Sequence, residues 1–302
     1  MVNCKWLMGV LLVGLTLACR AAAVPPTPPS PTLTVTPSHP HPFTPSPGHL
    51  VTPSPGHLVI PSPPADSGWQ LLQPGLERRT IRLLNENGRQ TEQLTILRID
   101  PTLFAFRLGY SPGQPKPLAT WQAETGAFIV VNGGFFTEEF LATGLIVVDG
   151  QASGSSYVGF GGMVTIGEGG VEVRSLRERP YDPNETFDYA LQSFPMLVLN
   201  GEPAYQTADF DAARRTVIGV DENGRVLLIF ASWGGLSLAE LSSTLASADF
   251  GLVNALNLDG GTSTGLVLAD PPESIPAFVP VPSVLLISPK GSFVNNFGYW
   301  VK

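Results

Sequence analysis

The strongest constraint on folding is a Pro-, Thr- and Ser-rich stretch that occupies residues 20–67 of the 302-residue chain. Within it the octad Thr44–Val51, with the sequence TPSPGHLV, is repeated as Thr52–Val59. This composition lacks the apolar side chains that a core needs and is typical of an extended, semi-rigid spacer. We therefore expect a disordered Pro-rich spacer here and a folded domain confined to residues 68–302.

Residues 1–19 have the layout of an export signal. Lys5 stands near the start, the apolar run Leu7–Leu17 follows, and Cys19 ends the segment. The run is shorter than the ~20 apolar residues of a membrane-spanning helix. The ending resembles a bacterial lipobox, although threonine stands where leucine is most common. We expect a bacterial lipoprotein, exported and anchored to the membrane through lipidated Cys19. A plain secretory peptide cleaved after Ala21 or Ala23 is the alternative.

The predicted domain contains neither histidine nor cysteine. The histidines of the chain all lie in the spacer: His39, His41, His49 and His57. The second cysteine, Cys4, lies in the signal. This excludes histidine-dependent triads, histidine-ligated zinc, thiol catalysis and disulfides from the domain. The net charge of −8 argues against a nucleic acid partner.

The domain sequence is a series of short apolar runs separated by turn residues, which is typical of strands. Strands are predicted at residues 94–99, 127–131, 145–148, 195–199 and 284–287, and hairpins at 149–150, 163–174 and 217–230. One helix is predicted after Ser237, which forms a capping box with Glu240. We expect a single α+β domain with a mixed, mainly antiparallel sheet and few helices, rather than a Rossmann-like fold.

The most informative stretch for function follows the apolar run Leu252–Leu258. It delivers a carboxylate, two glycines and two hydroxyls in succession: Asp259, Gly260, Gly261, Thr262 and Ser263. The glycines allow a tight turn and close approach to a ligand, and successive N–H groups in such a turn favour anions. An ordinary turn between strands is the alternative. A divalent cation such as calcium, held by Asp259 with hydroxyl and carbonyl oxygens, is left open; otherwise we expect no cofactor.

Residues 261–265 also match the G-x-S-x-G pattern of a serine nucleophile elbow. That pattern requires a histidine partner and a following helix. The domain has no histidine, and Leu266–Leu268 resembles a strand. The match therefore fails its context test, and the sequence argues against a serine hydrolase.

Two other stretches carry candidate site residues. Arg215 and Thr216 begin an apolar strand, where an arginine can clamp a phosphate or carboxylate; Arg214 would point to the other face. Asn132, Gly133 and Gly134 follow a buried strand and supply an amide with a flexible backbone. The structural alternative for Arg215 is an exposed charge at the start of a strand, and the alternative for residues 132–134 is a tight turn. The nearest candidates for a second carboxylate are Glu138 and Glu139.

Together these motifs resemble the phosphodiester glycosidase domain family. The resemblance rests on four segments in matching order: 132–136 (NGGFF), 194–201 (FPMLVLNG), 215–219 (RTVIG) and 255–264 (ALNLDGGTST). It extends over nearly the whole folded part, although family members commonly have a third glycine where Thr262 stands. The resemblance implies a site lined by Asn132, Arg215, Asp259, Gly260, Gly261 and Ser263. We assign catalysis to Asn132, Arg215 and Asp259, substrate binding to Gly133, Gly134, Thr216, Gly260, Gly261, Thr262 and Ser263, and no metal.

The resemblance implies a hydrolase that cleaves a sugar from a sugar-1-phosphodiester or a related surface glycan. The leaving phosphate oxygen has a pKa of about 6, against about 15.7 for water, so departure needs little help from a general acid. We expect Arg215 and the amides of residues 260–262 to hold the phosphate. Asp259 would act as base, nucleophile or oxocarbenium stabiliser. The alternative is a non-catalytic surface module that binds phosphosugar or wall polysaccharide.

Overall fold

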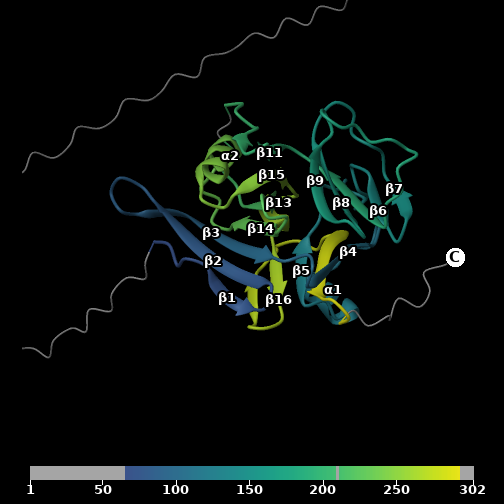
Figure 1. Cartoon of the computed structure of the whole chain (residues 1–302), viewed down its shortest axis with the longest axis horizontal. Helices are drawn as coiled ribbons and strands as arrows, with labels where there is room; N and C mark the ends of the chain where they lie inside the picture. The colour runs from purple at the N-terminus through teal and green to yellow at the C-terminus, as the bar shows by residue number, and fades with distance from the viewer. Residues whose placement is uncertain (1–64, 209–210, 293–302) are drawn as a thin grey trace, which may run out of the picture. The chain divides into compact units, whose positions relative to one another are not determined.

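The computed structural model describes residues 65–208 and 211–292 (Figure 1). The export signal with Cys19, and all but the last residues of the spacer, lie outside the described residues. Both assignments stay predictions. No helix among the described residues is long and apolar enough to cross a membrane.

The largest of the three sheets that the described residues form begins with the N-terminal hairpins of the domain and ends with strands from the middle of the chain. Its spatial order is β1 (Gln70–Gln73), β2 (Leu76–Leu84), β3 (Gln90–Ile99), β14 (Val226–Ala231), β13 (Arg215–Asp221), β15 (Leu252–Asn257), β11 (Met196–Leu199) and β12 (Glu202–Pro203). Strand β15 thus lies between β13 and β11, and this position determines what surrounds its C-terminal end.

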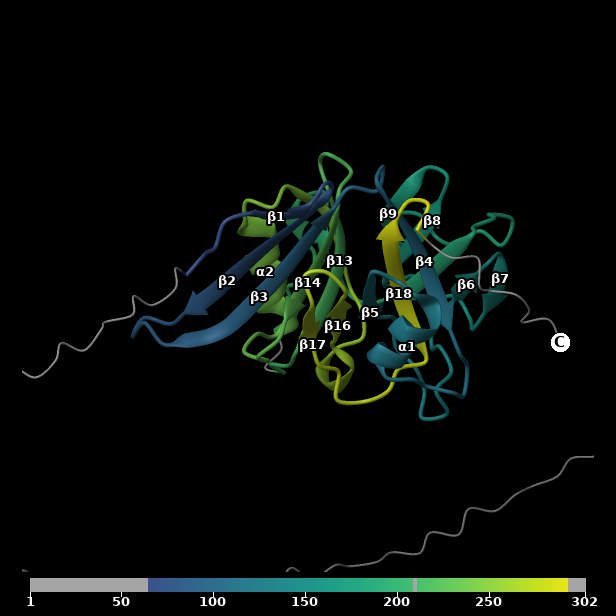
Figure 2. The same ribbon diagram turned by 90° about the horizontal axis from the view of Figure 1, so that it is seen from below.

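Two five-stranded sheets complete the fold (Figures 1 and 2). One has the order β17 (Glu273–Ile275), β16 (Leu266–Leu268), β5 (Ile129–Asn132), β18 (Ser283–Pro289) and β4 (Phe104–Tyr110). The other has the order β7 (Gln151–Ser153), β6 (Ile146–Val148), β10 (Tyr189–Ser193), β8 (Gly162–Gly167) and β9 (Gly170–Ser175). Each pairing of these strands in the described residues is antiparallel.

The main core is shared by the three sheets, and side-chain alternation along single strands explains how. On β5, Ile129 and Val131 face this shared core, while Val130 packs on the opposite face against α1 (Leu118–Thr125). Successive side chains of any strand alternate between its two faces, and because both faces of β5 are covered, all four of its residues are buried. Figure 2 shows α1 beside β5 and β18.

The predicted helix is α2 (Leu238–Ser247), and its capping box is present. The amide of Glu240 donates to the Ser237 hydroxyl, and the amide of Ser237 donates 2.8 Å to the Glu240 carboxylate. Such a cap contributes about 1 kcal/mol. The apolar face of α2, with Leu241 and Leu245, packs on the large sheet beside β11. The prediction of one α+β domain, mainly antiparallel and with few helices, is confirmed; its strands form three sheets.

Candidate active site

The site is built where the C-terminal end of β15 meets three other chain segments. In the register between β13 and β15, Val217 lies opposite Asn257, so Arg215 begins its strand level with Asp259. On the other side of β15 the amide of Asn257 donates 3.0 Å to the carbonyl of Pro195, just before β11. The amide of Asp259 donates 3.1 Å to the carbonyl of Gly133, just after β5.

Asn132 holds this junction together from inside the protein. Its side chain is 0 % exposed, and its amide nitrogen donates 2.7 Å to the main-chain carbonyl of Asp259. Its side-chain oxygen accepts from the Thr216 hydroxyl at 2.9 Å and from the Gly265 amide at 3.0 Å. Because these bonds engage both ends of its side-chain amide within the protein, Asn132 positions the turn that contains Asp259. The buried Thr216 hydroxyl holds the Asn132 side chain in this orientation.

Asp259 is partly buried and lies two residues after the end of β15. Burial raises the pKa of its carboxyl above the usual value. Hydrogen bonds from the Ser263 side chain and from the Gly260 amide, the latter 2.9 Å long, oppose this effect. Since burial is the larger cause, the Asp259 carboxylate is a stronger proton acceptor than an ordinary aspartate.

The turn after Asp259 uses its first two amides within the protein. The Gly260 amide donates to the Asp259 carboxylate, and the Gly261 amide donates 2.7 Å to the carbonyl of Arg214. Gly261 has φ +58°, and residues 261–263 form a single 3₁₀ turn, η1 (Gly261–Ser263). The expected anion cradle of three free amides is therefore not preformed, because the turn directs two of them inward. Thr262 is exposed at its tip.

Two arginines border the turn. The Arg215 side chain donates 2.6 Å to the carbonyl of Asp211, and it lies beside Gly260, whose added Cβ would be 3.6 Å from the Arg215 Cδ. Arg214 donates 3.0 Å to the carbonyl of Pro276, with its guanidinium 4.5 Å from the Phe278 ring centre. Among the described residues neither arginine forms an ion pair with Asp259.

Unpaired buried polar atoms concentrate around the same strand end. Ten buried side-chain polar atoms of the described residues have no hydrogen-bond partner, and half of them are Ser193 Oγ, Arg214 Nη1, Arg215 Nε, Asn257 Oδ1 and Thr264 Oγ1. A buried polar group without a partner costs about 1–3 kcal/mol. Such groups are rare in native proteins and mark functional sites or bound solvent. Two of the five are side-chain donors of Arg214 and Arg215, and the Arg214 carbonyl accepts from the Gly261 amide of the turn after Asp259.

Gly133 and Gly134 serve packing in this structure. A Cβ at Gly133 would lie 2.4 Å from the Ser283 hydroxyl, and one at Gly134 would lie 3.1 Å from the carbonyl of Gln192. Both distances are too short for an ordinary contact. The glycines therefore let β5 run close to β18 and β10, which brings Asn132 to Asp259.

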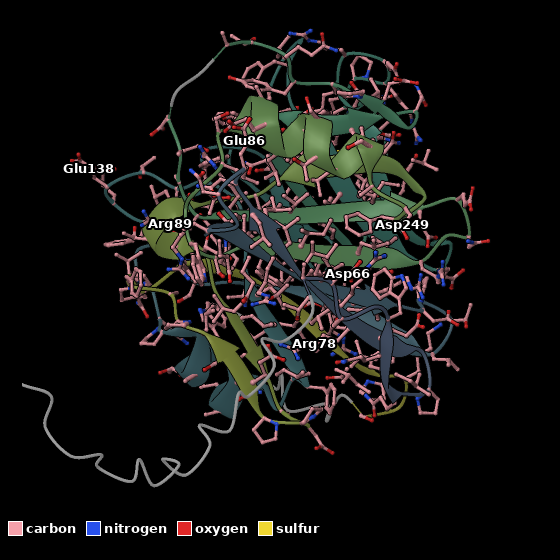
Figure 3. All side chains as sticks on the ribbon, turned by 90° about the vertical axis from the view of Figure 1, so that its left-hand side faces the viewer. Asp66, Arg78, Glu86, Arg89, Glu138 and Asp249 are labelled. Carbon is pink, nitrogen blue, oxygen red and sulfur yellow. The ribbon has the colours of Figure 1, made fainter. Side chains whose placement is uncertain are left out.

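The two candidates for a second carboxylate lie at the surface of the protein. Glu138 and Glu139 are exposed, and Figure 3 shows Glu138 on a loop that projects from the molecule. The described residues also contain no group of three histidine, cysteine or acidic side chains that could hold a metal ion. An open hollow of about 1050 Å³ lies elsewhere, against the β8–β9 hairpin, and its lining includes neither Asp259 nor Arg215.

Sequence reasoning did not assign Phe194 or Asn257 to the site. The Asn257 side chain donates 2.9 Å to the carbonyl of Phe194, so the two residues are joined directly beside Asp259. Both fall within the motifs at 194–201 and 255–264, which is the signal that could have identified them.

A family model described as phosphodiester glycosidase matches residues 125–288, which is more than half of the chain and includes Asn132, Arg215 and Asp259. The chain therefore belongs to the phosphodiester glycosidase family, and the predicted resemblance is confirmed.

Its relatives include a mouse protein, N-acetylglucosamine-1-phosphodiester alpha-N-acetylglucosaminidase. The two are 31% identical over 178 residues, which cover 50% of this chain and 34% of the mouse protein. The chain thus spans about a third of the length of this curated relative. The zebrafish enzyme of that name, solved as a catalytic domain auto-inhibited by its pro-peptide, has a TM-score of 0.58 at 20% identity, over 72% of this chain and 85% of that chain. That likeness shows the fold.

A Synechocystis hypothetical protein has a TM-score of 0.49 at 18% identity, over 71% of this chain and 62% of that chain.

Proposed function

We propose that this protein is a hydrolase that cleaves a sugar from a sugar-1-phosphodiester or a related surface glycan. The observation that carries the proposal is the environment of Asp259: a carboxyl with a raised pKa beyond the end of β15, level with Arg215 at the start of β13, in a domain of the phosphodiester glycosidase family. The chemistry breaks the bond between the anomeric carbon and the phosphate oxygen. It yields a free sugar and a phosphate monoester.

Asp259 acts on the sugar side of the bond. Its raised pKa suits a proton acceptor that activates water, or a nucleophile that attacks the anomeric carbon. The leaving phosphate monoester has a pKa of about 6 and departs with little protonation. One well-placed carboxylate is therefore sufficient for this reaction.

Arg215 and Arg214 act on the phosphate side. Each has a buried guanidinium nitrogen without a partner, Arg215 Nε and Arg214 Nη1. Charge-assisted hydrogen bonds from these groups would offset the negative charge that develops on the departing phosphate. The Thr262 amide, at the exposed tip of the turn, is a further donor, whereas the Gly260 and Gly261 amides first need to leave their internal acceptors.

We also propose that the domain acts outside the cytoplasm, tethered by a lipid on Cys19 through the spacer at residues 20–67. The support is the sequence of residues 1–19. Expression of the full chain in a bacterial host, followed by fractionation, tests the anchor. Wild type in the membrane fraction and Cys19→Ser in the soluble fraction are the expected results; both in the soluble fraction would contradict the anchor.

The enzymatic proposal is tested by release of sugar from N-acetylglucosamine-1-phosphodiesters and their glucose, galactose and mannose counterparts. We expect turnover by the wild type and its loss in Asp259→Asn. A non-catalytic surface module gives another outcome: wild type and variant release no sugar, while both bind the phosphosugar.

A further inference from the structure

An aromatic cluster stands on one side of the strand end that carries Asp259. The cluster consists of Phe135, Tyr157, Phe160 and Phe194. The rings of Phe135 and Phe194 are stacked with centres 4.5 Å apart, and Phe160 meets Phe194 edge-on at 5.7 Å. Tyr157 contacts both Phe160 and Phe194. Phe160 is 42 % exposed and Phe194 37 % exposed, so two rings of the cluster reach the surface.

The cluster and the arginines lie on opposite sides of β15. Phe194 lies two residues before the start of β11, and Arg215 begins β13; these strands are the two neighbours of β15 in the sheet. All three strand ends lie at the same edge because β11 and β13 both run antiparallel to β15. Asp259 therefore lies between a cationic side and an aromatic side. This order defines a direction along the site.

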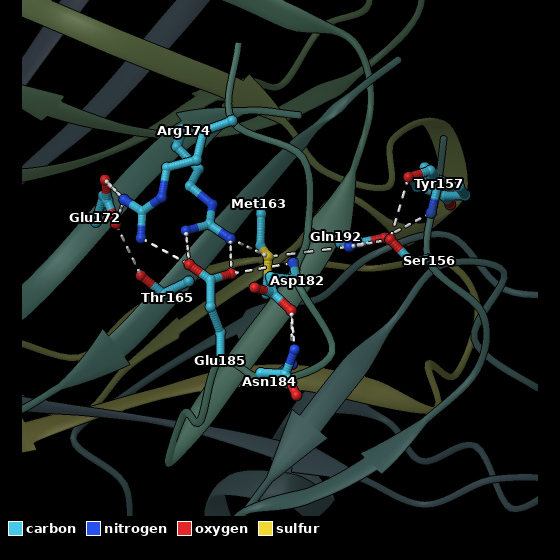
Figure 4. Close-up of polar contacts among 11 residues, drawn as sticks. Ser156, Tyr157, Met163, Thr165, Glu172, Arg174, Asp182, Asn184, Glu185 and Gln192 are labelled. Atoms are coloured by element: carbon cyan, nitrogen blue, oxygen red, sulfur yellow. Dashed lines mark hydrogen bonds and ion pairs between the residues drawn. The ribbon is translucent and has the colours of Figure 1, made fainter. Parts of the chain in front are cut away.

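A buried side chain fixes the loop that carries Tyr157 and Phe160. Gln192 is 1 % exposed, its oxygen accepts 2.8 Å from the Tyr157 amide, and its nitrogen donates 2.9 Å to the Ser156 hydroxyl (Figure 4). The Tyr157 and Thr143 hydroxyls are 2.6 Å apart. From the outer side Arg177 donates 3.1 Å to the carbonyl of Gly159. The exposed rings are thus held in place before any ligand arrives, which lowers the entropic cost of binding.

Buried polar atoms without partners lie beside the same rings. Ser193 Oγ precedes Phe194, and Asn257 Oδ1 belongs to the side chain that bonds to the Phe194 carbonyl. Aromatic surface with a few polar groups is the usual lining of a small-molecule site. The C–H face of a pyranose ring is apolar and packs on aromatic rings, whereas a phosphate does not.

We propose that the aromatic cluster is the sugar subsite of this enzyme: Phe160 and Phe194 stack on the pyranose ring whose anomeric carbon lies at Asp259, and the phosphate points to Arg215. The direction of the substrate rests on the proposed function. The contact between the sugar and the aromatic rings does not depend on the proposed function, because a neutral glycoside without phosphate would bind to the same rings.

The test uses the full-length protein and two separate readouts. The first is binding of the methyl α-glycosides of glucose, galactose, mannose and N-acetylglucosamine, followed by ligand-observed NMR. The second is KM and kcat on the matching sugar-1-phosphodiesters. The variants are Phe160→Ala, Phe160→Leu and Phe160→Trp, with Leu71→Ala as control, because Leu71 is 70 % exposed on β1.

We expect Phe160→Ala and Phe160→Leu to weaken glycoside binding and raise KM by roughly tenfold, as loss of an apolar ring contact predicts. Phe160→Trp, which retains an aromatic face, weakens both less than Phe160→Leu does, and Leu71→Ala changes neither. Arg215→Lys raises KM for the phosphodiester but leaves methyl glycoside binding unchanged.

Each alternative outcome is decisive. Equal glycoside binding by wild type and Phe160→Ala, or no glycoside binding by wild type, overturns the subsite even if turnover is normal. Glycoside binding that is lost in Phe160→Ala without any turnover by wild type overturns the proposed function and leaves the subsite standing. Arg215→Lys that weakens methyl glycosides as much as phosphodiesters overturns the direction of the substrate.

Discussion

The side-chain amide of Asn132 donates a 2.7 Å hydrogen bond to the main-chain carbonyl of Asp259, although the two residues are 127 positions apart in the chain. The bond joins the end of β5 to the turn that follows β15. It fixes the direction in which the Asp259 carboxylate points without touching that carboxylate. We therefore regard Asn132 as the residue that sets the geometry of the site.

The first prediction concerns Asn132→Ala. The substitution leaves the Thr216 hydroxyl, the Gly265 amide and the Asp259 carbonyl without their partner. At about 1–3 kcal/mol for each buried unpaired group, we expect the free energy of unfolding to fall by about 3 kcal/mol or more. Urea denaturation measures this loss. An unchanged midpoint would show that the bond network does not hold the turn.

A second prediction concerns the thermal stability of Asp259→Asn. The folded state raises the pKa of Asp259, so it holds the proton more tightly than the unfolded state does. The contribution of Asp259 to the free energy of unfolding is therefore most favourable below the pKa that it has in the unfolded chain. It is lost as the pH rises through the higher pKa that Asp259 has in the folded protein. The variant should have a higher Tm than wild type at neutral pH. Its matched control is Glu86→Gln, an exposed carboxylate in the β2–β3 turn (Figure 3), which should not change the Tm.

The third prediction is the pH dependence of turnover. If Asp259 acts in its ionised form, activity falls as pH decreases through its raised pKa, so the acid limb of the kcat/KM profile lies above the usual range of an aspartate, about 3.9. Initial rates measured from about pH 3 to about pH 8, a range that brackets the usual pKa of an aspartate, give the position of the acid limb. An acid limb at or below the ordinary aspartate value would contradict the role of burial at Asp259.

The fourth prediction concerns the ion pair between Arg174 and Glu185. The Arg174 guanidinium lowers the pKa of the Glu185 carboxyl from 4.5 to about 2, with N–O distances of 2.9 and 2.5 Å (Figure 4). A lowered pKa stabilises the fold above the unfolded value, and this contribution is lost as pH falls from 4.5 through about 2.

Glu185→Gln should therefore lower the free energy of unfolding at neutral pH by roughly 3 kcal/mol, because it leaves the buried Arg174 without its carboxylate. The difference from wild type should shrink as the pH approaches about 2. Denaturant titrations at several pH values measure it. A difference that stays constant over that range would exclude the ion pair as its cause.

Short sequence motifs predict the elements whose structure is determined by residues next to each other in the chain. The capping box at Ser237 correctly predicts α2, and Asp149-Gly150 correctly predicts the β6–β7 hairpin. Helix α1 is not predicted, because Pro117 offers no side-chain cap and the helix has almost no amphipathic pattern. Its place is determined by packing of Leu118 and Trp121 on the sheet of β5.

The site is less accessible to sequence reasoning than the fold. The motifs identify Asp259 and Arg215, but they cannot show that the Gly261 amide is already bonded to the Arg214 carbonyl. Nor can they place Phe194 beside Asn257, which is 63 residues away, since that contact depends on the order of strands in the sheet. The conformation of the turn after Asp259 and the order of the strands in the large sheet both arise from tertiary packing, which the motifs do not encode.

The central claim is that Asp259 and Arg215 form the catalytic centre of a sugar-1-phosphodiester hydrolase. The most direct measurement is the release of free sugar and phosphate monoester from N-acetylglucosamine-1-phosphodiester by wild type, Asp259→Asn and Glu86→Gln. We expect wild type and Glu86→Gln to turn over at the same rate, and folded Asp259→Asn to lose on the order of a thousandfold or more. Turnover by Asp259→Asn at the wild-type rate would contradict the claim.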